Sequence, residues 1–268
     1  MDLLKLLKET EAAVKEASKQ MMVAFTMEEK GSPANIATSA DLAVQRFLEQ
    51  RLPELLPCSA VFGEEGGAGE TNTPYLWIVD PIDGTTNFAR GIPECAISVA
   101  LLHEEKLLLG VVYNPYQDKL YSACLDHGAK CNGRPIHVSD KAFEAGLFCT
   151  AMSLYRKEFA GRCMDVIGEV YAQCSDVRRF GSCALELCYL AEGVCDLYFE
   201  YRVFPWDCAG ALLILQEAGG VSCAAKGLPV PMDRTAPVLA ANNRENLERI
   251  LKIVDKHIPD FEYEEILR

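Results

Sequence analysis

The chain of 268 residues lacks the features that would place it in a membrane or on nucleic acid. No apolar run reaches the ~18 residues that a membrane span needs. Positive charge is scarce, with 26 Lys and Arg against 39 Asp and Glu and a net charge of −13, whereas general nucleic-acid or membrane-surface binders need a basic patch. Segment 1–20 is charged throughout and lacks the separate basic and apolar blocks of a signal peptide. We therefore expect a cytoplasmic protein.

Several catalytic signatures are also missing. The chain has only 4 histidines, and it contains no G-x-S-x-G, no H-E-x-x-H, no P-loop and no dinucleotide-binding glycine fingerprint. Its 12 cysteines include no C-x-x-C pair, and most stand in apolar segments such as ALELCYLAEGVCDLYF at 184–199. Free cysteine behaves as a small buried hydrophobe, so we expect reduced core thiols rather than disulfides or a zinc site.

The hydrophobic pattern indicates a globular protein with two kinds of organisation. Apolar residues recur at helical spacing over 2–22 and again from Asp41, with Pro53 expected just beyond the end of that second helix. An antiparallel meander follows, and helices and strands alternate after it. Strands are expected at 60–62, 75–79, 96–102, 107–113, 119–124, 146–150, 175–178, 195–199, 221–223 and 238–240.

The pattern predicts an α+β N-terminal half rich in antiparallel sheet and a C-terminal half of α/β character. Two packed sheets with helices between and outside them would accommodate both halves. No repeat or low-complexity linker divides the chain. We expect any seam between subdomains near 141–146.

The segment LWIVDPIDGTTNF at 76–88 carries the clearest chemistry. An apolar strand ends at Asp80, and Asp83 follows three residues later. Their carboxylates and the Ile82 carbonyl are the oxygen ligands that Mg²⁺ prefers. Gly84 and the threonines after it can present backbone N–H groups to an anion. Metal ligands beside an anion site are the components of phosphate-ester chemistry, although an ordinary turn explains Asp and Gly after a strand equally well.

Two other acidic segments accompany this one. The sequence GEE at 63–65 also follows a strand and offers Glu64 and Glu65. The sequence FPWDCAG at 204–210 places Asp207 at the start of a helix, where an aspartate is more often a cap than a ligand. Four carboxylates that converge would repel one another unless cations bound between them.

These segments, in this order, resemble the inositol monophosphatase family. The resemblance rests on GEE, WIVDPIDGTTNF and PWDCAGALLILQEAGG, supported by RRFGSCALEL at 178–187 and VLAANN at 238–243. It spans residues 2 to 256 and implies a single inositol-monophosphatase-like catalytic unit over 1–268. It further implies an αβαβα sandwich, a homodimer, dependence on Mg²⁺ and sensitivity to lithium.

The resemblance also implies a role for each site residue. Thr85 would orient the attacking water, Asp41 would raise the basicity of Thr85, and Glu64 would complete the catalytic set. Two Mg²⁺ ions would be held, with a third bound more loosely through water at Glu64. The implied metal ligands are Glu64, Asp80, the Ile82 carbonyl, Asp83 and Asp207. The implied substrate contacts are Asp83, the amides of Gly84 and Thr85, the backbone of Cys183, Glu200 and Asp207.

Four residues stand apart from this scheme. Asn35 occupies a place where relatives usually carry Asp, which affects the local loop and the loosely bound third ion. Arg202 lies where smaller residues are frequent; it would pair with Glu200, contact a second anionic group on the substrate, or lie on the surface. Arg178 and Arg179 are interpreted as solvated or structural, with a dimer contact as the alternative.

The sequence therefore predicts a Mg²⁺-dependent phosphomonoesterase acting on a small polyol phosphate, with inositol monophosphate first. Its partner would be a small phosphorylated metabolite, without a membrane or general nucleic-acid role. The alternatives within the superfamily are fructose-1,6-bisphosphatase, histidinol-phosphate phosphatase and 3′-phosphoadenosine-5′-phosphate phosphatase. A regulatory binding partner of the transcription machinery is the alternative from another class.

Overall fold

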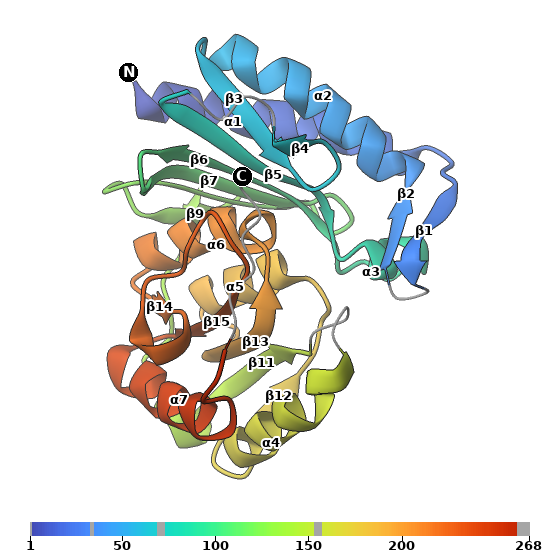
Figure 1. Cartoon of the computed structure of the whole chain (residues 1–268). Coiled ribbons are helices and arrows are strands. Elements are labelled where there is room, and N and C mark those ends of the chain that lie inside the picture. The colour runs from blue at the N-terminus through green and yellow to red at the C-terminus, as the bar shows by residue number, and fades with distance from the viewer. Residues whose placement is uncertain (1, 33–34, 69–72, 153–156, 262–268) are drawn as a thin grey trace.

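The computed structural model describes residues 2–32, 35–68, 73–152 and 157–261. Two helices, an eight-stranded sheet, two further helices, a five-stranded sheet and a last helical pair follow one another as layers (Figure 1). This is the expected αβαβα sandwich. No helix within the described ranges has both the length and the apolar character needed to cross a bilayer.

The first sheet is largely antiparallel and has the strand order β10-β9-β8-β7-β6-β5-β3-β4. Only the β3–β5 pair is parallel. The helices α1 (Leu3–Ala17) and α2 (Ser39–Leu55), with the 3₁₀ turn η1 (Ser18–Met22), cover its outer face. The strands are β3 (Ser59–Gly63), β4 (Gly67–Ala68), β5 (Tyr75–Asp83), β6 (Ala96–His103), β7 (Lys106–Asn114), β8 (Lys119–Cys124), β9 (Ala129–Cys131) and β10 (Arg134–Pro135).

The second sheet has the order β12-β11-β13-β15-β14. Strand β11 runs parallel to both of its neighbours, whereas β15 is antiparallel to both of its own. The strands are β11 (Leu147–Ala151), β12 (Asp176–Arg178), β13 (Leu197–Val203), β14 (Val221–Cys223) and β15 (Ala236–Ala241). The short 3₁₀ turns of this half are η2 (Phe143–Ala145), η3 (Lys157–Phe159) and η4 (Ala225–Gly227).

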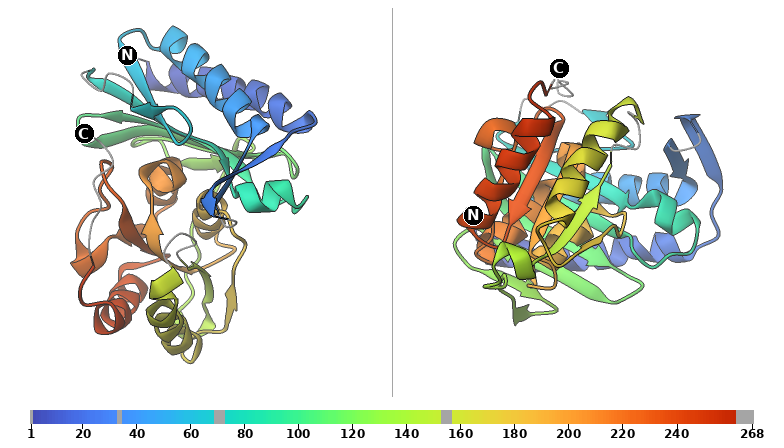
Figure 2. Two further views of the ribbon diagram at one scale, coloured as in Figure 1. Left: turned by 45° about the vertical axis from the view of Figure 1, so that its right-hand side comes forward. Right: turned by 90° about the horizontal axis from the view of Figure 1, so that it is seen from below.

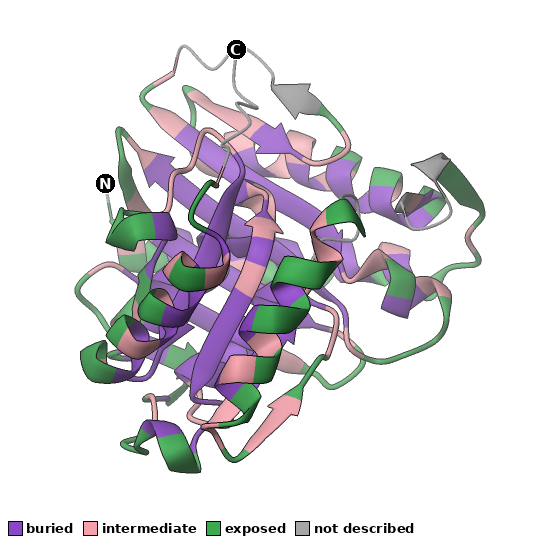
Figure 3. Ribbon diagram, turned by 60° about the horizontal axis from the view of Figure 1, so that its bottom comes forward, coloured by how far each residue is buried: buried purple, intermediate pink, exposed green. Residues whose placement is uncertain are grey.

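Burial explains which helices lie inside. All nine residues of α5 (Cys183–Ala191) and most of α6 (Pro205–Glu217) are buried, because these two helices pack between the sheets. The outer helices α4 (Ala160–Tyr171) and α7 (Arg244–His257) are amphipathic and expose one face to solvent (Figure 3). All twelve cysteines are free, and ten of them are buried, as expected for core thiols.

Pro53 was expected beyond the second helix, and that prediction is wrong. Pro53 lies inside α2, two residues before its last residue, Leu55. A proline in the last turn removes the hydrogen bond that its own N–H would have made, and its ring crowds the carbonyl four residues earlier. The turn continues past it, since the Leu56 N–H donates to the Leu52 carbonyl at 3.1 Å.

Two further features were not anticipated from the pattern. Strands β1 (Met27–Ser32) and β2 (Asn35–Thr38) pair as an antiparallel hairpin beside α3 (Thr85–Ala89) (Figure 2). Strand β5 continues to Asp83 instead of ending near residue 80. Both features lie beside the segment that carries the site residues.

Candidate active site

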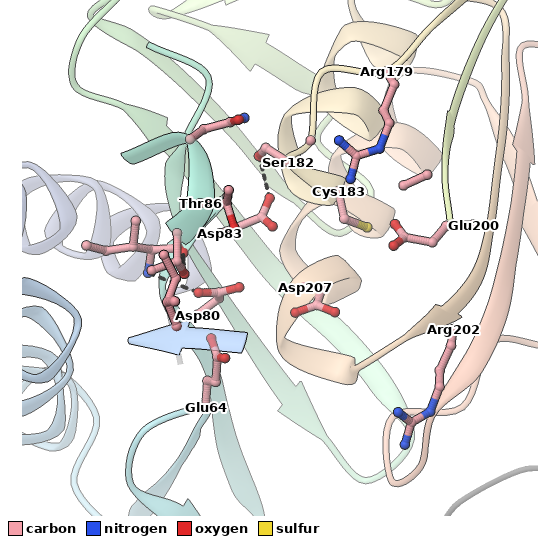
Figure 4. A pocket seen from close by; sticks show the side chains of 17 residues that line it. Glu64, Asp80, Asp83, Thr86, Arg179, Ser182, Cys183, Glu200, Arg202 and Asp207 are labelled. Carbon is pink, nitrogen blue, oxygen red and sulfur yellow. Dashed lines mark hydrogen bonds between the residues drawn. The ribbon is translucent and has the colours of Figure 1, made fainter. Parts of the chain in front are cut away.

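A pocket of about 220 Å³ lies where the ends of β3, β5 and β13 meet the N-termini of α3, α5 and α6. Segments far apart in sequence line it together. Figure 4 shows Glu64, Asp80 and Asp83 on one side, with Asp207 and Glu200 facing them from the other. Five acidic side chains therefore share one pocket.

A bulge in β5 puts Asp80 and Asp83 into the same pocket. Asp80 pairs with Ser98 and Asp83 with Ala96, so three steps along β5 oppose two steps along β6. In a regular strand, residues 80 and 83 would face opposite sides of the sheet. The extra residue removes this alternation, and both carboxylates line the pocket.

Gly84 turns the chain from β5 into α3. Its φ is +84°, in the left-handed region that favours glycine. A Cβ on Gly84 would lie 2.8 Å from the Glu94 carbonyl oxygen, so a side chain there would also collide with backbone. The turn brings Gly84, Thr85 and Thr86 to the pocket wall, where the first amides of a helix have no acceptor within it.

Three of the carboxylates are each fixed through one oxygen. Asp80 Oδ1 accepts from the Ile82 N–H at 3.0 Å, and Asp207 Oδ2 accepts from the Phe204 N–H at 2.9 Å. Asp83 Oδ2 accepts from the Ser182 hydroxyl and, at 2.7 Å, from the Ala184 N–H, both at the N-terminus of α5. The fixed oxygens orient these side chains before any ligand binds.

The pocket concentrates negative charge. Burial raises the pKa of Asp80 well above its ordinary value, and the charges of Glu64, Asp83 and Asp207 raise it further. Burial likewise raises the pKa of Asp207 well above the ordinary range. Burial raises the pKa of Asp83 to about 6, against the lowering effect of its hydrogen bonds.

This donor set fits a hard divalent cation. The donors are oxygens, which Mg²⁺ prefers, and their mutual repulsion is relieved by positive charge. No three His, Cys, Asp or Glu side chains in the described ranges already form a closed metal-binding cluster. The acidic residues line both sides of the pocket without forming such a cluster.

Thr85 lies between two acceptors. Its hydroxyl is 3.0 Å from the Ile82 carbonyl oxygen and 3.5 Å from Asp41 Oδ1. A hydroxyl has one proton, so it donates to one of them at a time. Asp41 is buried behind Thr85, where Thr38 donates to its Oδ2 from the backbone N–H at 2.8 Å and from the hydroxyl. Burial raises the pKa of Asp41 to about 6.

Glu200 and Arg202 extend from one face of β13 on the far side of the pocket. Tyr198 donates to Glu200 Oε2 at 2.7 Å. Burial raises the pKa of Glu200 to about 7, although the Tyr198 hydrogen bond lowers it. The Arg202 guanidinium lies 5.1 Å from the Phe204 ring centre and also lines the pocket.

The structure brings nearly all of the expected site residues together. Asp41 does not line the pocket but lies behind Thr85, while the side chain of Asn35 falls outside what the structure describes. Pocket-lining residues among those expected are Glu64, Asp80, Ile82, Asp83, Gly84, Thr85, Cys183, Glu200 and Asp207.

Sequence reasoning missed two residues. Ser182 was assigned no role in the site; it caps α5, and its hydroxyl also donates to Asp83. Arg179 was interpreted as solvated or structural, yet it lines the pocket. The only local signal was the glycine two residues after Arg179, which marks a tight loop.

Comparisons with known proteins agree over the whole chain. A model of the inositol monophosphatase family matches residues 2–259. Inositol monophosphatase 1 of Mus musculus is 34% identical over 235 residues, 84% of each chain. The structure of inositol monophosphatase from Anabaena (Nostoc) has a TM-score of 0.83 at 28% identity, covering 96% of this chain and 97% of that one. A structure described as IMPase/NADP phosphatase complexed with Mg²⁺ and phosphate has a TM-score of 0.83 and covers 97% of both chains. At 24% identity it shows the fold alone.

Proposed function

Because this chain belongs to the inositol monophosphatase family of phosphoric monoester hydrolases, we propose that it hydrolyses inositol monophosphate in the acidic pocket. The family depends on Mg²⁺. The observation that carries the proposal is the meeting of five carboxylates with the N-terminus of α3 in one pocket. The carboxylates suit cations, and the amides suit a phosphate.

The groups assigned to the metal are four carboxylates and one backbone carbonyl, all of which line the pocket. Glu64, Asp80, the Ile82 carbonyl, Asp83 and Asp207 would hold two ions, and Glu64 would help to hold a third. Bound Mg²⁺ supplies charge neutralisation for the phosphate and lowers the pKa of an attacking water.

Thr85 and Asp41 are assigned to proton transfer from the attacking water. The Thr85 hydroxyl accepts from that water while its own proton is held by Asp41. The Thr85 hydroxyl oxygen lies 3.5 Å from Asp41 Oδ1 and 3.0 Å from the Ile82 carbonyl oxygen. The hydroxyl proton must therefore rotate from the carbonyl to the carboxylate. Asp41 accepts it only when ionised.

Carboxylates from both sides of the pocket are assigned to the polyol. Asp83 on one side and Glu200 and Asp207 on the other accept hydrogen bonds from hydroxyl groups, and the backbone of Cys183 contributes at the first residue of α5. The Tyr198 hydroxyl holds one oxygen of Glu200 and leaves the other available. A neutral, hydroxyl-rich leaving group suits these acceptors better than an anionic one.

The test is phosphate release from inositol 1-phosphate, with Mg²⁺ and with a chelator. We expect turnover only with Mg²⁺, and Asp80→Asn should lower kcat by on the order of 10³ or more because the two ions share this ligand. Asp165→Asn makes the same change at an exposed position of α4 and should leave turnover unchanged. Metal-independent turnover, or a fully active Asp80→Asn enzyme, would contradict the proposal.

Arg202 supports a second candidate substrate, a sugar bisphosphate. Its guanidinium lines the same pocket as Glu200, from the same face of β13. Fructose 1,6-bisphosphate should then be preferred over inositol 1-phosphate by tenfold or more in kcat/KM, and Arg202→Ala should abolish the preference. We expect the opposite order, because Glu200 repels a second phosphate.

The remaining family properties belong to the same proposal. A homodimer, sensitivity to lithium and a cytoplasmic location are supported by the family resemblance. Light scattering of the purified protein tests the dimer. Inhibition of phosphate release by lithium chloride, with sodium chloride as the control, tests the sensitivity to lithium.

A further inference from the structure

Arg179 faces the acidic pocket from a loop, and the proposed mechanism gives this residue no role. It is exposed, it lines the pocket, and its guanidinium points toward Cys183 and Glu200 (Figure 4). Neither a hydrogen bond nor an ion pair ties that guanidinium to any residue in the described ranges. As far as the described ranges go, its five donors are available to a ligand.

The loop that carries Arg179 is firmly held from behind. Glu186 is fully buried, and its Oε1 accepts from the Phe180 N–H at 2.6 Å and the Gly181 N–H at 2.9 Å. Asn87 donates to the Phe180 carbonyl at 2.7 Å, which ties the loop to α3. Gly181 has φ of +87°, and a Cβ there would lie 3.1 Å from Asn87 Nδ2. These contacts fix the backbone on which Arg179 stands.

The charge of Arg179 acts on Glu200. Burial, the Tyr198 hydrogen bond and the Asp83 charge affect the pKa of Glu200 more strongly, but Arg179 lowers it as well. The two side chains come from different elements, the 179–182 loop and β13, and both line the pocket (Figure 4). One presents donors only, and the other presents acceptors.

The geometry points to Arg179 as a substrate-binding residue that, with Glu200, recognises neighbouring hydroxyl groups of the polyol leaving group. The inference rests on the proposed function. Arg179 would donate to one hydroxyl oxygen while Glu200 accepts from the next. A leaving group without hydroxyl groups would gain nothing from either side chain.

Arg178 provides a matched control, because it has the same charge and is the adjacent residue. Its guanidinium is paired with Asp176 at 2.5 Å, and it does not line the pocket. Arg178 therefore tests for a general effect of losing one positive charge from this loop, whereas a substrate role belongs to Arg179 alone.

The experiment compares two substrates across three variants in saturating Mg²⁺. Inositol 1-phosphate has a polyol leaving group, and p-nitrophenyl phosphate has an aromatic one without further hydroxyl groups. Arg179→Ala should raise KM for inositol 1-phosphate about 10- to 100-fold with kcat nearly unchanged, as for loss of a charged hydrogen-bond partner. Its kcat/KM for p-nitrophenyl phosphate should stay within about twofold of wild type. Arg179→Lys should recover part of the loss, and Arg178→Ala should match wild type on both substrates.

Other outcomes overturn the inference in distinguishable ways. Equal losses on both substrates would mean that Arg179 supports the fold or the phosphate. No loss on inositol 1-phosphate would mean that it does not touch the substrate. A tenfold greater loss on inositol 1,4-bisphosphate than on inositol 1-phosphate would assign it to a second anion instead. A wild-type enzyme that cleaves p-nitrophenyl phosphate but not inositol 1-phosphate would overturn the proposed substrate as well.

Discussion

Asp80→Asn should make the metal-free protein more stable while removing its activity. Asp80 is 1% exposed and lies close to the charges of Glu64, Asp83 and Asp207. Its pKa in the folded state lies well above the ordinary value of 3.8. The folded state therefore retains a proton that the unfolded chain releases. The free energy of unfolding is highest below pH 3.8 and declines as the pH rises toward the folded-state pKa.

The size of this effect is limited by the pH of the experiment. One pKa unit corresponds to about 1.4 kcal/mol, so at pH 7 the penalty at Asp80 is at most about 4 kcal/mol. Asparagine does not titrate, and its Oδ1 can still accept from the Ile82 N–H. For a chain of this size each kcal/mol corresponds to about 2–4 °C in Tm, so a rise of several degrees is expected.

The assay is calorimetric or fluorimetric unfolding at pH 7 and pH 4.5, with a chelator and with Mg²⁺. With the chelator, the Tm gain of Asp80→Asn should be large at pH 7 and small at pH 4.5. With Mg²⁺ at about 100 times its Kd, wild type should gain about 2.7 kcal/mol, and the variant should lose most of that gain. Asp165→Asn should follow wild type throughout. A lower Tm for Asp80→Asn in the chelator at pH 7 would refute the reasoning, because the cluster would then be stabilising without cations.

Three further predictions concern other parts of the molecule. Thr85→Ala and Asp41→Asn should each lower kcat about 100-fold with KM little changed, as for loss of general-base assistance. The kcat of the wild type should also fall below about pH 6, because Asp41 becomes protonated there. The pH profile of Asp41→Asn should lack this fall. A change confined to KM would move both residues to substrate binding. Glu200→Gln should raise KM for inositol 1-phosphate about tenfold, measured by phosphate release, whereas an unchanged KM would exclude contact with the polyol. Glu217→Ala should cost about 1–3 kcal/mol in urea unfolding, because its carboxylate accepts three backbone N–H groups of residues 126–128, and kcat should not change.

The local sequence was enough to indicate the chemistry of the site, because several proposed metal-binding and phosphate-binding residues lie close together in the chain. Asp80, Ile82, Asp83, Gly84 and Thr85 fall within six residues, so their residue types alone indicated cations beside an anion. Helices and most strands were also visible, since apolar spacing reports which face of each element is buried. The layered arrangement followed from having two sheets that each need both faces covered.

Only the tertiary structure decided how those residues face one another. The bulge after Asp80 depends on pairing with β6, and without it Asp80 and Asp83 would lie on opposite faces. Pro53 remains in α2 because neighbouring turns hold the helix together, which no propensity at that position indicates. Arg179 lies 115 residues after Glu64 in the chain, and it reaches the pocket because Glu186 and Asn87 hold its loop. Contacts between residues so far apart in the chain depend on packing between elements, and they cannot be predicted from the residue spacing within one segment.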